Sequence, residues 1–129
     1  MTYDLPTTSK WVRTEELHPR FKYRLNAFFK DNRIMGRVKI VSGVRTQAAQ
    51  QALYDKYKAG RGNLAANPNR RMSNGMRGSY HMAQEAFGGY GYAVDLRITG
   101  KGLTTAEVNR IAAEYGCVKT VPSEWWHVC

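Results

Sequence analysis

The chain has 129 residues, of which 43% are hydrophobic and 23% are charged. This length fits one domain that can bury a core, and this composition excludes a disordered or fibrous protein. Twenty Lys and Arg against ten Asp and Glu give a formal charge of +10, which favours polyanionic partners such as nucleic acid or the anionic polymers of a bacterial envelope. A surface that is charged only for solubility is a third interpretation.

We expect no targeting segment in this chain. Its first thirty residues contain no apolar run behind a basic start, and nowhere do eighteen apolar residues follow one another, so we expect neither a signal peptide nor a membrane span. Cys117 and Cys129 lack CxxC spacing and companion pairs. This pattern favours two free thiols over a bridge.

The first predicted element is a helix from about Pro19 to Asn32, with His18 as a possible N-cap. Four apolar residues recur there at helical spacing: Phe21, Leu25, Phe28 and Phe29. We expect this helix to be structural. A short strand follows from Arg37 to Ser42.

A second helix is predicted from a cap at Thr46 to about Lys58, and Gly60 and Gly62 end it. One face of this helix carries Ala49, Leu53 and Tyr57. Residues 60–80 then lose all periodicity, and their Gly, Asn and Pro content predicts a long loop. Long loops in small domains often carry function.

The last third predicts a central strand from Tyr92 to Ile98. A capping-box pair, Thr104 and Glu107, starts a helix that runs to about Tyr115. Two short final strands are predicted over Cys117–Val121 and Trp125–Val128. This order of elements favours an α+β domain.

Three residues satisfy the ligand count of a hydrolytic zinc site. Such a site takes about three protein ligands from His, Asp, Glu or Cys and leaves a position for water, and His81, Asp95 and His127 meet this need. A carboxylate that is not a ligand can take the water's proton, and Glu124 is the candidate base. Glu124 and His127 are three residues apart, so an extended chain needs a kink or bulge for both to reach one metal.

Asp95 supports this hypothesis because it places a charge within an otherwise apolar strand, YAVDL. An unpaired buried carboxylate costs several kcal/mol, so we expect a cation or a metal beside it. Each candidate has a simpler interpretation as a structural residue. Their combination carries the argument.

Four ordered segments, SGVRT (42–46), GSYH (78–81), GYAVDL (91–96) and EWWHV (124–128), resemble the motifs of the zinc D-alanyl-D-alanine carboxypeptidase and L-alanyl-D-glutamate endopeptidase family, which includes many phage endolysins. The resemblance implies a Hedgehog/DD-peptidase fold, which is a small antiparallel sheet flanked by helices with the metal at its open face. It also implies one Zn²⁺ per chain.

The matched positions imply roles for single residues. His81, Asp95 and His127 would be the metal ligands, and Glu124 would be the base. Arg45 would steady the substrate carbonyl or carboxylate, a role that suits the planar fork of a guanidinium. The spacing of fourteen residues from His81 to Asp95 is longer than is usual in the family and indicates an insertion after His81. His18 is the alternative ligand, although its place before Pro19 favours a cap.

Substrate contacts are expected from Ser79, Tyr80 and Trp126. Ser79 would contribute a hydrogen bond. The two aromatic residues belong to a wider aromatic set that could line a groove for a stem peptide or pack in the core: Tyr80, Phe87, Tyr90, Tyr92, Trp125 and Trp126. Four loop arginines could attract anionic wall polymers or stem-peptide carboxylates: Arg61, Arg70, Arg71 and Arg77. A solvated loop is the alternative interpretation of these arginines.

The resulting prediction is a single catalytic peptidase domain over residues 1–129, whose excision from a longer endolysin remains open. We expect a monomer that is made in the host cytoplasm and acts on the peptide of the bacterial wall after release. An endopeptidase is favoured because lysis requires cutting load-bearing bonds, and a D-Ala-D-Ala carboxypeptidase is the alternative. A non-catalytic module that binds wall or nucleic acid is the alternative from another class, but no nucleic-acid-binding motif appears.

Overall fold

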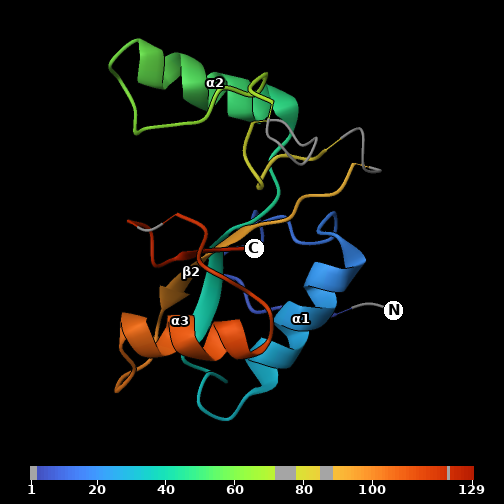
Figure 1. The fold of residues 1–129 in the computed structure, drawn as a ribbon, viewed down its shortest axis with the longest axis vertical. Coiled ribbons are helices and arrows are strands. Elements are labelled where there is room, and N and C mark those ends of the chain that lie inside the picture. The colour runs from blue at the N-terminus through green and yellow to red at the C-terminus, as the bar shows by residue number, and fades with distance from the viewer. Residues whose placement is uncertain (1–2, 72–77, 85–88, 122) are drawn as a thin grey trace.

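The computed structural model describes residues 3–71, 78–84, 89–121 and 123–129, and over these it forms three helices and one small antiparallel sheet (Figure 1). The order is α1 (Pro19–Lys30), β1 (Val38–Ser42), α2 (Gln47–Lys58), β2 (Val94–Ile98), α3 (Thr105–Glu114) and β3 (His127–Val128). The expected α+β class with a small antiparallel sheet is therefore confirmed. None of these helices is long and apolar enough to cross a bilayer.

The predicted caps set where the helices begin. The His18 side chain accepts a hydrogen bond from the Arg20 amide, and Thr46 accepts one from the Ala49 amide. Both hydrogen bonds of the capping box at the start of α3 are present. These bonds satisfy amides that a first helical turn leaves without partners, so the sequence signals located all three starts correctly.

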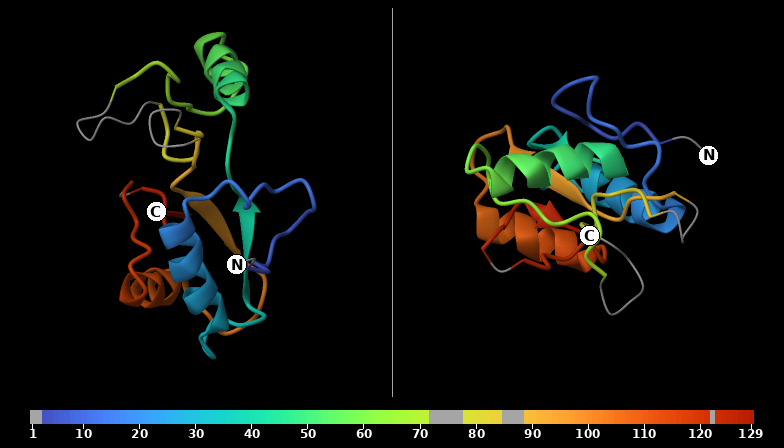
Figure 2. Two further views of the ribbon diagram at one scale, coloured as in Figure 1. Left: turned by 90° about the vertical axis from the view of Figure 1, so that its right-hand side faces the viewer. Right: turned by 90° about the horizontal axis from the view of Figure 1, so that it is seen from above.

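The sheet order is β1-β2-β3, and α1 and α3 pack on one face of it (Figures 1 and 2). The core lies between these layers and contains Leu25, Phe28, Ile40, Leu96 and Ile111, each at most 2% exposed. Successive side chains of a strand point to opposite faces. Val94 and Leu96 therefore enter the core, and Asp95 points away from the two helices.

Register places the polar residues of the sheet beside one another. Asp95 pairs with His127 across β2 and β3. On the other side of β2, a bulge between Ile40 and Ser42 brings Ser42 opposite Asp95. A bulge bends its strand and redirects the residues that follow. Here it occurs where the chain leaves β1 toward Arg45.

The expected strand over Cys117–Val121 is wrong, and the face of α2 that carries Ala49, Leu53 and Tyr57 does not enter the core. Leu53 and Tyr57 of α2 are 39% and 38% exposed, and Gln50 is the only buried residue of that helix. Figures 1 and 2 show α2 standing apart from the layers of sheet and helices, so its apolar residues have no core to enter. Residues 117–121 form only an isolated bridge, Lys119 with Val128, because the last strand is two residues long.

Candidate metal centre

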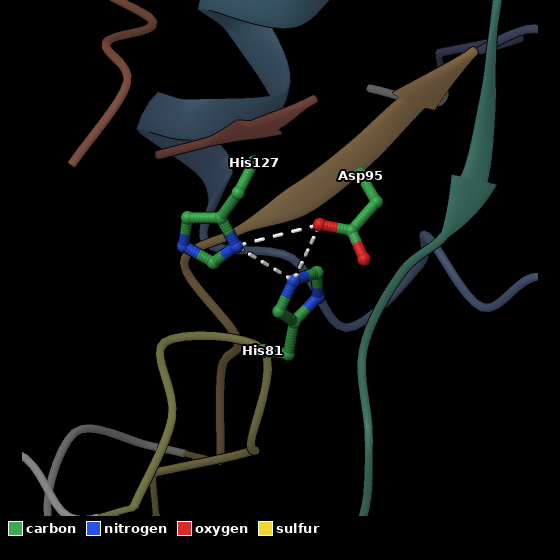
Figure 3. A group of neighbouring side chains, drawn as sticks. All are labelled: His81, Asp95 and His127. Atoms are coloured by element: carbon green, nitrogen blue, oxygen red, sulfur yellow. Dashed lines mark hydrogen bonds and ion pairs between the residues drawn. The ribbon is translucent and has the colours of Figure 1, made fainter. Parts of the chain in front are cut away.

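His81, Asp95 and His127 meet at one point, although they come from three different segments (Figure 3). His81 Nε2 lies 3.0 Å from Asp95 Oδ1 and 3.1 Å from His127 Nδ1. His127 Nδ1 lies 3.4 Å from Asp95 Oδ1. His81 and His127 are only 2% and 7% exposed. Together these atoms form a triangle of two nitrogens from buried imidazoles and one oxygen from the half-buried Asp95.

The triangle fits a zinc ion. Ligand atoms at about 2.0–2.1 Å from a tetrahedral zinc lie roughly 3.3 Å from one another, close to the observed spacings. Two imidazoles and one carboxylate are also donors that zinc accepts in hydrolytic sites. The three sequence-predicted ligands therefore form a group that could hold this metal.

The backbone around His81 fixes which nitrogen it offers. Its Nδ1 lies 2.9 Å from the Gly43 carbonyl oxygen, so Nδ1 is the protonated donor and the lone pair of Nε2 faces Asp95 and His127. The Ser79 hydroxyl accepts a hydrogen bond from the His81 amide. The Arg45 amide donates to the His81 carbonyl oxygen at 2.7 Å. These contacts hold the loop of His81 against the segment that follows β1.

Gly43 has a structural role that the sequence analysis missed. A Cβ at this position would overlap the Arg13 carbonyl oxygen, which accepts a hydrogen bond from the Val44 amide. No side chain fits without moving the backbone. The glycine of the SGVRT segment is the signal that could have identified this close approach.

The chain makes the expected kink before His127. The His127 amide donates to the Glu124 carbonyl oxygen at 3.2 Å, which closes a turn directly before β3. Glu124 is half-buried, is not one of the three clustered donors, and lies near Arg45. The turn thus leaves Glu124 outside the triangle while His127 enters it.

Arg45 is the expected cation beside Asp95, with its Nη2 4.0 Å from Asp95 Oδ2. Its Nη1 donates to Gln50 Oε1 at 3.1 Å, and Gln50 Nε2 donates to the Ala66 carbonyl oxygen at 2.9 Å. Burial lowers the pKa of Arg45, while Asp95 and Glu124 raise it. Gln50, which the sequence analysis also missed, therefore orients the guanidinium.

Asp95 and His127 shift each other's pKa values in opposite directions. Burial alone would raise the pKa of Asp95, but hydrogen bonds from His127 and His81 lower it below its usual range. Burial would likewise lower the pKa of His127, but the Asp95 carboxylate and the Cys129 side chain raise it to about 9. A proton on His127 thus occupies the place where a cation would bind.

The other predicted site residues differ in how far they are exposed and in what they pack against. Tyr80 is half-buried, Trp126 is 36% exposed, and Trp125 packs against the core. His18 caps α1, stacks on Tyr92 at a centroid distance of 4.9 Å, and does not belong to the cluster.

The described arginines of the predicted loop are exposed to solvent. Arg61, Arg70 and Arg71 are exposed, whereas Arg77 and Phe87 lie outside the described residues. Both cysteines are free, as expected, and burial raises the pKa of the Cys117 thiol to about 12.

Comparison with known sequences gives no match to a protein-family model and none to a curated protein. Comparison with solved structures finds the same fold in two peptidases. One is the LdcB LD-carboxypeptidase, with a TM-score of 0.62 and 17% identity over 99% of this chain and 65% of that chain.

The other is a variant of the vancomycin-resistance D,D-pentapeptidase VanY in complex with Zn(II), with a TM-score of 0.58 and 20% identity over 98% of this chain and 78% of that chain. The chain thus spans about two thirds of the LdcB chain. These likenesses show that it has the fold that the four motifs imply.

Proposed function

We propose that the chain is a zinc-dependent peptidase that hydrolyses a peptide bond in bacterial peptidoglycan. The observation that carries this proposal is the triangle of His81 Nε2, Asp95 Oδ1 and His127 Nδ1, with spacings of 3.0–3.4 Å. Its support is the fold, which is shared with a peptidase described as recognising peptidoglycan and with one that binds Zn(II). The order of the four motifs adds independent support.

In this proposal His81, Asp95 and His127 would hold the zinc ion. The chemistry that zinc supplies in such a site is Lewis acidity, which polarises a peptide carbonyl and makes a water molecule more acidic. The chain's own residues would provide the rest. Gly43 keeps the proton of His81 on Nδ1, and this leaves Nε2 free to act as a ligand.

Glu124 would accept a proton from the attacking water and pass it to the leaving amine. It suits this role because it is half-buried, lies outside the ligand triangle and is joined to His127 by a tight turn. Arg45 would donate hydrogen bonds to the substrate oxygen on which negative charge develops. The amide of Gln50 would keep the guanidinium turned toward that place.

We propose an endopeptidase of the phage endolysin type, because lysis requires cutting bonds that bear load. The second candidate is a carboxypeptidase that trims the stem peptide, and the names of the two solved peptidases favour it. The two differ in their products. A carboxypeptidase releases a single amino acid, whereas an endopeptidase creates new ends inside the stem or the cross-link.

The test is mass spectrometry of the fragments that the zinc-loaded protein releases from purified peptidoglycan. Glu124→Ala and a chelator-treated sample run beside it, and metal content is measured on every sample. We expect new amino and carboxyl ends only with the intact, zinc-loaded protein, while Glu124→Ala keeps its zinc and loses activity. Absence of cleavage by folded, zinc-bound protein would refute the proposal and favour a binding module.

A further inference from the structure

A cleft of about 410 Å³ lies beside the first turns of α1. Its lining comes from the first turns of α1, from the segment before His81 and from the C-terminal residue: His18, Arg20, Phe21, Arg24, Tyr80, Tyr92 and Cys129. This volume is within the usual range of ligand sites. Among the described loop arginines, Arg61, Arg70 and Arg71 do not line the cleft.

Two residues of the cleft lining, Tyr80 and Cys129, lie close in sequence to two of the candidate ligands. Tyr80 directly precedes His81, and its carbonyl oxygen accepts a hydrogen bond from the Tyr92 amide at 2.7 Å. Cys129 lies two residues after His127. Figure 2 places the C-terminus near the first turn of α1. A peptide that crosses the metal centre can therefore extend into this cleft.

Two cations in the cleft have no ion-pair or hydrogen-bond partner among the residues that the structure describes. Arg20 and Arg24 are four residues apart, so they lie on one face of α1, where like charges repel each other. Neither guanidinium forms an ion pair or a hydrogen bond with any residue that the structure describes. An anion bound between them would supply the missing partner.

The remaining walls of the cleft are aromatic. The ring of His18 stacks on Tyr92 with an interplanar angle of 24°, and Tyr80 is half-buried. His18 Nδ1 already accepts a hydrogen bond from the Arg20 amide, so the neutral ring carries its proton on Nε2 as a donor. The cleft thus offers donors for an anion beside flat surfaces for the aliphatic part of the same ligand.

We propose that this cleft is a substrate subsite in which Arg20 and Arg24 bind a carboxylate of the peptide. The inference rests on the proposed function, because it takes its ligand to be a peptidoglycan stem peptide. Such a peptide has two kinds of carboxylate, one on its glutamyl residue and one at its C-terminus. Binding of the terminal carboxylate would indicate a carboxypeptidase, and binding of the glutamyl carboxylate would indicate an endopeptidase.

The test measures binding by calorimetry to metal-free protein, so that it does not depend on cleavage. The probes are a synthetic stem pentapeptide and two analogues, one with a glutamyl carboxamide and one with a C-terminal carboxamide. The proteins are wild type, Arg20→Gln, Arg24→Gln and Lys101→Gln. Lys101 is exposed in the loop after β2 and does not line the cleft. The control substitution Lys101→Gln therefore removes one positive charge, as each arginine substitution does, but at a place away from the cleft.

We expect each arginine substitution to weaken binding of the free-acid peptide by about fivefold or more, while Lys101→Gln changes it less than twofold. One of the two carboxamide analogues should bind to the wild-type protein more weakly than the free-acid peptide, by a similar factor. The arginine substitutions should weaken the binding of that analogue little further. The analogue that binds more weakly identifies which carboxylate of the peptide Arg20 and Arg24 bind.

Equal losses for all three peptides would overturn the subsite, as would losses no larger than those of Lys101→Gln or the absence of binding by any peptide. The proposed function can fail separately. Cleavage without the arginine–carboxylate coupling would refute only the subsite. Coupled binding without cleavage by zinc-loaded protein would refute only the peptidase.

Discussion

The sheet with its two covering helices and the arm formed by α2 contribute to the same centre in different ways. The sheet supplies Asp95 and His127 by register, within a core where Leu25 and Phe28 are fully buried. Helix α2 contributes one buried residue, Gln50, which holds Arg45. The difference teaches that the geometry of the His81, Asp95 and His127 cluster is tied to the stability of the fold, whereas the orientation of Arg45 depends on one local contact.

The largest expected contrast comes from two leucines. Leu25→Ala removes a fully buried side chain from the core and should lower the free energy of unfolding by about 3 kcal/mol. Leu53→Ala removes a side chain that is 39% exposed on α2, and we expect a loss below about 1 kcal/mol. Urea unfolding of both variants measures this difference. Equal losses would show that α2 packs against the core in solution.

A second contrast separates metal binding from fold. Asp95→Asn replaces the only anionic donor of the triangle and should weaken zinc binding by about 100-fold or more. Arg97→Gln, on the same strand with an exposed side chain, is the matched control and should keep wild-type affinity. Competition with a chromophoric chelator gives both constants. Unchanged affinity in Asp95→Asn would mean that the carboxylate is not a ligand.

The contribution of α2 to the orientation of Arg45 can be tested with two neighbouring glutamines. Gln50→Leu removes the partner of Arg45 and of the Ala66 carbonyl oxygen, so we expect about a tenfold loss of kcat/KM with zinc affinity unchanged. Gln51→Leu removes only a surface contact with Asp55 and should be nearly neutral. Loss of zinc from Gln50→Leu would contradict the proposed separation of arm and sheet.

A further expected effect is on the pH dependence of stability and zinc binding. Because the pKa of His127 is raised to about 9 in the metal-free protein, its proton stabilises the fold fully below about pH 6.5 and this contribution is lost as pH rises through 9. Zinc must displace that proton, so its affinity should increase about tenfold per pH unit below 9. Chelator competition from pH 7 to 8.5 measures the slope. A flat profile would mean that His127 is already neutral.

Local signals predicted much of the fold. Pro19 after His18, the cap at Thr46 and the pair Thr104 and Glu107 marked the starts of all three helices, because caps act through bonds within one turn. The periodicity of α2 located its apolar face but did not show that this face is exposed. Helical periodicity shows which residues share a face, but not whether another layer lies against it.

The three clustered residues were all named from the sequence, since few residue types bind zinc and the chain has only three histidines. The residues that position them were not predicted from the sequence. Gly43 and Gln50 act through contacts with His81 and Arg45 that depend on the path of the backbone after the bulge in β1. Arg20 and Arg24 were assigned to a structural helix because nothing in the local pattern shows that a cleft lies beside it.

X-ray absorption spectroscopy of the zinc-loaded protein tests the central claim most directly, because it reports the atoms bound to the metal. We predict one zinc per chain with only nitrogen and oxygen neighbours at about 2.0–2.2 Å, and loss of this signal in His127→Ala. A sulfur neighbour at about 2.3 Å would assign Cys129 as a ligand in place of one of the three. That result, or failure to bind zinc at all, would contradict the centre described for His81, Asp95 and His127.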